Sequence, residues 1–251
     1  MDEPSIWILA ASFTIVGALY ASVGHAGASG YLAVMALMGI DAATMRPTAL
    51  AVNVLVAAIA SAQFCRAGHF SWKLAWPFLV AAPPAAFAGA ALHLDPRAIR
   101  MAIGVALMFA ACRMAISCMQ MRRADAVSKG VRPPSRPIAL ASGAVIGAFS
   151  GITGTGGGIV LSPLMLLRRW ATVHGVAAVS AVFILANSIA GLGGLALDGW
   201  RPDASLASLA CAGCIGGAIG ARIGSRHLGI AWMRGILALV LLIAATKLVL
   251  S

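Results

Sequence analysis

Long apolar runs, separated by short polar or glycine-rich stretches, follow one another along the whole chain. Because about 20 apolar residues in a helix cross a bilayer, each run of that length predicts a membrane-spanning helix. Two further runs, over 31–40 and 159–167, are too short to cross. The long runs cover residues 6–22, 47–65, 74–94, 98–118, 137–152, 175–197, 204–221 and 230–250.

Each short run follows a glycine-rich break, GHAGASG over 24–30 and GITGTGGG over 151–158. Glycine disfavours a helix by about 1 kcal/mol relative to alanine, so neither segment is expected to stay helical. Irregular backbone at membrane depth must be buried in protein or line a cavity. The following short helix then turns its free N–H groups and positive dipole end toward the break, an arrangement that suits an anion. Alternatively, the glycines only allow close helix packing.

The two halves of the chain resemble each other around one polar, basic stretch. That stretch, 119–136, is predicted to be a cytoplasmic linker between a first membrane repeat over 1–118 and a second over 137–251. A shift of 130 residues lays Gly24 on Gly154, Gly27 on Gly157 and Met35 on Met165, and a shift of 134 lays Asn53 on Asn187. Duplicated halves are common in transporters.

The 18 Lys and Arg residues indicate how the halves are oriented, because basic residues gather in cytoplasmic loops. If each long-plus-short pair crossed the membrane once, the halves would be parallel, with 10 basic residues on the linker side and 8 on the other. If each pair is a hairpin that returns to its own side, the halves are inverted and the split becomes 13 against 5. The charges favour an all-α integral membrane protein of two inverted repeats, each a broken-helix hairpin plus three transmembrane helices.

The composition excludes several other classes of protein. Hydrophobic residues make up 61% of the 251, charged residues only 10%, and mean hydropathy is +0.95, which leaves no room for a soluble catalytic domain. The net charge of +11 therefore does not predict nucleic-acid binding. The acidic start argues against a cleaved signal, so the run from Ile6 is expected to be retained. The five cysteines, including the lone C-x-x-C of Cys211 and Cys214, are interpreted as packing residues rather than metal or redox ligands.

The acidic residues all lie at the ends of runs or in loops. Cation carriers usually place carboxylates inside the membrane, so an anionic or neutral substrate is expected. The spans also contain no carboxylate pair or histidine cluster, so no enzyme, metal or cofactor is predicted. The glycines over 213–224 lie at helical spacing and predict a packing face.

Polar residues within or beside the breaks are the candidates for substrate binding. His25 offers an imidazole that donates to an anion or carries a proton. Asn53 and Asn187 either brace the hairpins or contact substrate, and Arg46 either draws anions inward or simply flanks a helix. The predicted substrate-binding residues are Gly24, His25, Gly27, Asn53, Thr153, Gly154, Thr155, Gly156, Gly157, Gly158 and Asn187.

The segment GITGTGGGIVLSPL over 151–164 resembles the glycine-rich signature of the TauE/SafE sulfite-exporter family of membrane permeases. The first half carries a degraded copy, in which Ala26 and Ala28 stand where glycines are expected and Ala33 where proline is expected. The resemblance extends to the size, the duplicated halves and the basic linker. It implies transport of sulfite, sulfonates, thiosulfate or related small anions across the bacterial cytoplasmic (inner) membrane by a multi-pass protein.

The leading hypothesis is a secondary transporter for such an anion, with one half moving against the other. Residues 151–158 lack the Lys-Ser/Thr end of a P-loop, so a gradient rather than a nucleotide is expected to drive transport. The alternative is an anion channel of the same architecture. The predicted partners are the anion and the lipid bilayer, without nucleic acid. The sequence is compatible with either a monomer or a homo-oligomer.

Overall fold

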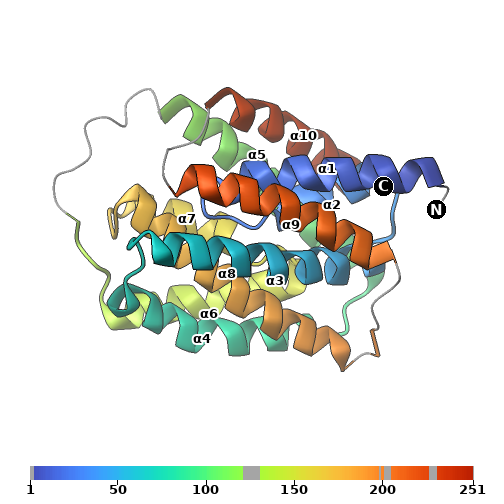
Figure 1. Ribbon diagram of the computed structural model, residues 1–251. Coiled ribbons are helices and arrows are strands. Elements are labelled where there is room, and N and C mark those ends of the chain that lie inside the picture. Colours follow the sequence, from blue (N-terminus) through green and yellow to red (C-terminus); the bar gives the residue numbers. More distant parts are fainter. Residues whose placement is uncertain (1–2, 121–130, 198, 201–204, 226–230, 251) are drawn as a thin grey trace.

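In a computed structural model the protein is a bundle of α-helices with no strand among the described residues, which are 3–120, 131–197, 199–200, 205–225 and 231–250. The helices lie roughly along one common direction (Figure 1). The predicted runs agree with them to within a few residues at most ends. They are α1 (Glu3–Ala21), α2 (Ala28–Leu37), α3 (Ala42–Arg66), α4 (Trp72–Ala90), α5 (Pro96–Gln120), α6 (Arg136–Thr153), α7 (Gly158–Leu167), α8 (Val173–Ala196), α9 (Ser205–Gly224) and α10 (Ala231–Leu250).

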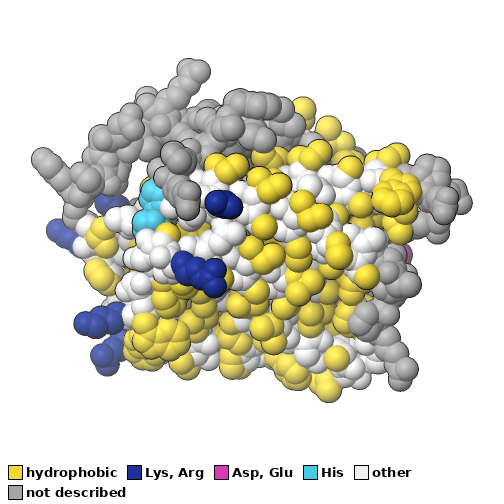
Figure 2. Space-filling model, viewed as in Figure 1, with side chains coloured by type: hydrophobic (Ala, Val, Ile, Leu, Met, Phe, Trp, Pro, Cys, Tyr) yellow, Lys and Arg dark blue, Asp and Glu magenta, His cyan; other side chains and the backbone are white. Residues whose placement is uncertain are grey.

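Four of the described helices are long and apolar enough to cross a membrane: α3, α6, α8 and the Leu206–Gly224 part of α9. The helices α2 and α7 are short and apolar, with ten residues each. Large apolar side chains cover the outer surface (Figure 2), including Trp7 at 72% exposure and Val145 at 70%. An exposed apolar surface of this extent fits contact with lipid. The prediction of an all-α integral membrane protein is confirmed.

The closest helix pairs join one half of the chain to the other, α1 with α9 and α4 with α6. Glycines make the close approach of α1 and α9 feasible, because a methyl group at Gly216 or Gly220 would collide with the backbone of Thr14 or Ala18. The predicted glycine packing face on α9 is therefore confirmed. In both pairs residue numbers rise together along the contact, so the paired helices run parallel. The contacts between α6 and α4 are Gly143 with Phe78, Gly147 with Ala82 and Gly151 with Ala86.

The helices α3 and α8 pack against each other at the centre and run antiparallel. Asn53 contacts Ser188, and Phe64, one turn from the end of α3, clusters with Ala177 near the start of α8. Both helices begin at a side-chain cap. The Asp41 carboxylate accepts the Ala43 N–H at 3.0 Å, and the Thr172 hydroxyl accepts the Gly175 N–H at 3.2 Å. The Asp41 cap starts α3 at Ala42, five residues before the predicted run.

The two halves repeat the same backbone hydrogen bonds 130 residues apart. The Ile40 N–H donates to the Met35 carbonyl and the Trp170 N–H to the Met165 carbonyl, and each bond closes the end of a short helix. The boundaries of the two repeats stay a prediction. Residues 121–130 of the predicted linker lie outside the described residues, and α5 extends two residues past the predicted boundary at 118.

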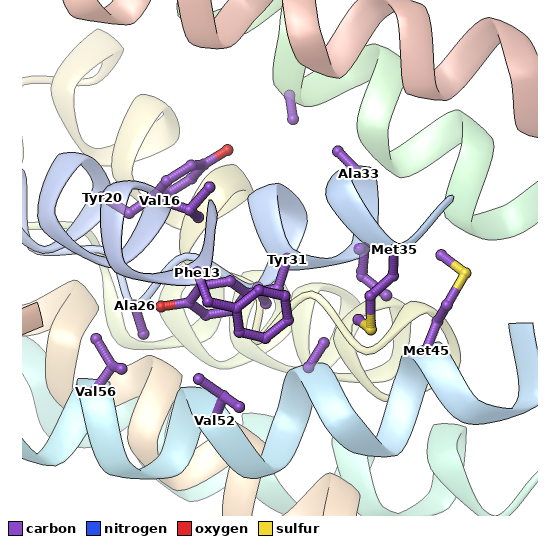
Figure 3. Close-up of a cluster of buried hydrophobic side chains, with 14 of the residues drawn as sticks. Phe13, Val16, Tyr20, Ala26, Tyr31, Ala33, Met35, Met45, Val52 and Val56 are labelled. Carbon is purple, nitrogen blue, oxygen red and sulfur yellow. The ribbon is translucent and has the colours of Figure 1, made fainter. Parts of the chain in front are cut away.

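A cluster of buried side chains holds the first hairpin, α1 and α2, against α3 (Figure 3). The ring of Phe13 stacks on that of Tyr31 with 4.4 Å between centroids. The Tyr20 hydroxyl lies 2.7 Å from the Ser29 hydroxyl, which ties α1 to α2. The hairpin is therefore a packed unit rather than a loose insertion.

Most of the described Lys and Arg side chains gather where α3, α7 and α9 end and α4, α6 and α8 begin, on the left in Figures 1 and 2. We call this the basic end. The Arg132 N–H donates to the Arg169 carbonyl there at 2.9 Å. Arg122, Arg123, Lys129, Arg201 and Arg226, which also entered the orientation prediction, lie outside the described residues. The described basic residues at this end are Arg66, Lys73, Arg132, Arg136, Arg168, Arg169 and Arg222.

Candidate anion-binding site

The chain leaves the helical conformation between α6 and α7, as the glycines predicted. Gly154, Gly156 and Gly157 have φ angles of +74°, +72° and +78°, in the left-handed region that only glycine enters readily. At the start of α7 the N–H groups of Val160 and Leu161 donate to the Gly157 carbonyl at 3.1 Å, whereas those of Gly158 and Ile159 have no acceptor one turn earlier in their own helix and are directed into this break. The second break therefore presents backbone donors inside the bundle.

The first break, between α1 and α2, has the same backbone form. Gly24 and Gly27 also have positive φ, at +77° and +103°. Gly27 and Gly157 are the left-handed residues directly before the two short helices. The alanines at 26 and 28 therefore leave the break itself intact.

His25 connects the two breaks. Its Nε2 lies 3.1 Å from the carbonyl oxygen of Gly158, the first residue of α7, and its Nδ1 lies 3.2 Å from the carbonyl oxygen of Val23. A neutral imidazole carries one N–H and donates to one of these oxygens, whereas the imidazolium donates to both. The position thus provides for a bound proton.

Buried amide side chains line the second break. Asn53 of α3 and Asn187 and Ser188 of α8 are at most 1% exposed. The Asn53 Nδ2 donates to the Ser188 hydroxyl at 3.3 Å. A methyl group placed on Gly156 would lie 2.5 Å from the Asn53 Nδ2, and one on Gly157 would lie 3.3 Å from the Asn187 Nδ2. The two asparagines, which the sequence placed at related positions, therefore face neighbouring glycines.

Asn187 has no hydrogen-bond partner for either its Nδ2 or its Oδ1, and the Oδ1 of Asn53 also has none. Leaving a buried polar group without a partner costs about 1–3 kcal/mol. A polar ligand between the amides and the α7 N-terminus would offset that cost. The amide nitrogen supplies a donor for an anion.

The threonines of the break are occupied within the protein. The Thr153 hydroxyl donates to the Phe149 carbonyl at 2.8 Å and accepts from the Thr155 hydroxyl at 2.9 Å. Both hydroxyl hydrogens are thereby used, so Thr153 and Thr155 brace the turn.

Arg46 is buried, and its interpretation as a residue flanking a helix is wrong. It lies inside α3, is 5% exposed, and donates to the Gly151 carbonyl at 3.0 Å and the Ala90 carbonyl at 3.4 Å. It thus ties the ends of α6 and α4 together beside the second break. One signal was available in the sequence: Arg46 is the only Lys or Arg in the first 65 residues.

A cavity of about 120 Å³ lies next to the first break, between α1, α5, α7 and α8. His25 lines it, together with Ser162 of α7, His174 of α8 and Arg113 of α5. Leu166 and Val173, which also line it, are 40% and 45% exposed, so its mouth faces the basic end. Sequence reasoning did not select Arg113 or His174 for a site, because neither lies near a motif.

Within the described part of the chain, no three His, Cys, Asp or Glu side chains come together as a metal site. The described cysteines are free thiols, and those of Cys65, Cys112 and Cys211 are exposed on the outer face rather than packed inside. A cysteine behaves as a small hydrophobic residue, so these exposed positions on the apolar surface suit contact with lipid.

Comparison with known proteins agrees with this architecture. The model of the sulfite exporter TauE/SafE family matches residues 9–248. The chain is also similar to the "Probable membrane transporter protein y4hK" of Sinorhizobium fredii (strain NBRC 101917 / NGR234), with 42% identity over 253 residues and 99% of each chain covered. No solved structure matches.

Proposed function

The chain belongs to the sulfite exporter TauE/SafE family and is a multi-pass membrane transporter, and we propose that it is a secondary transporter for a small sulfur-containing anion such as sulfite or an organosulfonate. The substrate would cross the bacterial cytoplasmic membrane.

One observation carries this proposal: the second break joins left-handed glycines, the α7 N-terminus and the unpartnered amide of Asn187 in a fully buried place. The positive end of a helix dipole and backbone N–H groups together favour an anion. The two carboxylates whose side chains the structure describes, Asp41 and Asp95, are exposed and accept backbone N–H groups at helix starts. Among the described side chains, no carboxylate therefore opposes an anion there.

The packing supports an inverted-repeat arrangement. The corresponding helices α3 and α8 run antiparallel, as two inverted halves require, whereas two parallel halves would place them parallel. With the basic end in the cytoplasm, the cavity beside His25 opens inward. Arg46 closes the opposite side of the second break through Gly151 and Ala90. An opening toward one side and a closure on the other are what we would expect of one state of an alternating-access transporter, which supports the proposal of a transporter over a channel.

The tight pairs α1–α9 and α4–α6 change the expected motion. Because each pair contains one helix from each half, the moving bodies would combine helices of both halves rather than separate one half from the other. His25, at the junction of the breaks, would carry the coupling proton. Its imidazolium holds Val23 and Gly158 together, and loss of the proton releases one of the two bonds.

Transport by purified protein in vesicles tests the proposal. We expect saturable uptake of sulfite or a small sulfonate that a proton gradient accelerates and that Asn187→Leu abolishes. The control Asn187→Asp has nearly the same shape but adds a negative charge, and should lose anion binding as well. Uptake that never saturates, or single-channel currents, would instead favour the anion channel. Full anion uptake by both variants would contradict the site.

A further inference from the structure

The cavity at the basic end has walls that a small inorganic anion does not need. Its lining is largely apolar and is contributed by α1, α3, α5, α7, α8, α9 and the first break. Apolar walls disfavour a strongly hydrated ion that has no charged partner, because moving such a charge out of water is costly unless it is paired. The apolar lining includes Val23, Phe64, Ala110, Ile159, Leu166 and Val176.

Arg113 is the one charged side chain among the described residues that line this apolar cavity. Its Nε is buried and has no hydrogen-bond partner. The other titratable groups in the described lining are His25, His174 and Tyr20, and the described lining contains no carboxylate. A guanidinium beside apolar walls, with an unused donor, is strongly favoured to pair with an incoming carboxylate or sulfonate. The cavity therefore combines a single cation with space for an apolar group.

We propose that this cavity is a separate binding site for organic monoanions that carry a short apolar body, with the sulfonate or carboxylate group on Arg113 and the body against Phe64, Ile159 and Leu166. An apolar cavity of roughly 150 Å³ in another protein holds benzene, so about 120 Å³ suits a body of about four to six carbons. The inference rests on the proposed function in one respect: it names the class of anion that reaches the second break from the basic end.

Binding of unbranched alkanesulfonates to the purified full-length protein tests this site. Burial of each methylene group tightens binding roughly fourfold. We therefore expect butanesulfonate to bind tens of times more tightly than methanesulfonate in calorimetric titration, with no further gain beyond about six carbons. Arg113→Gln should weaken butanesulfonate about tenfold or more, while Arg113→Lys retains part of the affinity. The neutral butanesulfonamide should bind equally to both variants and to the native protein.

Two matched controls separate this site from general effects. Arg222→Gln removes an exposed positive charge from the same end of the molecule and should leave binding unchanged. Leu166→Ser should reduce the gain per methylene, whereas Leu167→Ser, at the next residue, which is 62% exposed and outside the cavity, should not. Both leucines are exposed enough for serine to be tolerated by the fold.

The proposal is overturned if affinity does not depend on chain length, or if Arg113→Gln binds butanesulfonate like the native protein. A chain-length effect without dependence on the charged group or on Arg113 would mean that the cavity only accommodates lipid or detergent, which also overturns it. Vesicle uptake separates the two proposals. Sulfite uptake without cavity binding leaves the transporter intact and removes this site. Cavity binding without uptake of any anion leaves this site intact and removes the proposed transporter function.

Discussion

Replacing Gly156 by alanine tests the second break directly. Gly156 has φ +72°, and a methyl group there would lie 2.5 Å from the Asn53 Nδ2, 3.0 Å from Ile184 and 3.3 Å from the Ser188 hydroxyl. Ordinary van der Waals contact begins near 3.4 Å, so the Asn53 amide must retreat by about 1 Å. That displacement breaks its 3.3 Å hydrogen bond to Ser188.

Two costs add in this variant. A non-glycine residue in the left-handed region costs about 1–2 kcal/mol. Forcing extra volume into a packed interior costs about 1–3 kcal/mol more. The expected loss of stability for Gly156→Ala is therefore about 2–5 kcal/mol, together with loss of anion binding because the amide donors no longer face the break.

Gly39→Ala is the matched control, because it separates backbone strain from the clash. Gly39 has φ +76°, nearly the same as Gly156, but nothing lies within 4 Å of a methyl group placed there. Gly39→Ala should therefore lose only the 1–2 kcal/mol that a non-glycine residue costs in the left-handed region. Thermal unfolding of both variants, measured with and without sulfite or methanesulfonate, gives the stability and the anion-dependent shift together.

The expected result is a larger loss of stability in Gly156→Ala than in Gly39→Ala, with the anion-dependent shift lost only in Gly156→Ala. Equal losses of stability in the two variants would mean that the Asn53 side chain moves away from the added methyl group at no cost. A normal anion shift in Gly156→Ala would refute the assignment of the second break as the site.

Three further predictions concern neighbouring residues and the topology. His25→Gln should remove the dependence of uptake on a proton gradient while anion binding persists, measured as uptake with and without an imposed pH difference; proton-coupled uptake that is unchanged would count against a proton on His25. Asn187→Leu should stabilise the anion-free protein by about 1–3 kcal/mol, because an unpartnered buried amide is replaced by an apolar group of similar size. Its unfolding temperature should therefore be higher than that of the native protein, and adding anion should no longer raise it. Cysteines introduced at Ala43 and Ala171 in a cysteine-free background should react with impermeant reagents from opposite faces of the membrane; labelling from the same face would contradict the inverted arrangement.

Much of the fold follows from hydrophobic length alone. A run of about 20 apolar residues has few folded alternatives to a helix, which explains the agreement between the predicted runs and the helices. The breaks were equally predictable, because Gly156 and Gly157 occupy a backbone region that few other residues tolerate. Which helices pack against each other was harder to predict, although the glycine spacing of α9 indicated that it has a packing face.

The site was predictable in part. His25 was selected as a candidate because it lies in the first break, and Asn53 and Asn187 because they are polar residues in apolar runs, where such residues are rare enough to be informative. The role of Arg46 was misjudged because Pro47 suggested a helix start, whereas the Asp41 cap begins the helix a full turn earlier. Arg113 was not selected because residues from six helices line its cavity, and no local sequence pattern encodes such a convergence.

The parallel pairing of α1 with α9 also has a consequence for biosynthesis. Thr14 contacts Gly216, which is made about 200 residues later. At a synthesis rate of roughly 5–20 residues per second, α1 waits about 10–40 s in the membrane before its principal partner exists. Its glycine-matched face must spend that interval against lipid or a membrane chaperone. The last fifth of the chain, which begins with α9, therefore completes the environment of the first helix, and a truncation before α9 should leave α1 a target for membrane proteases.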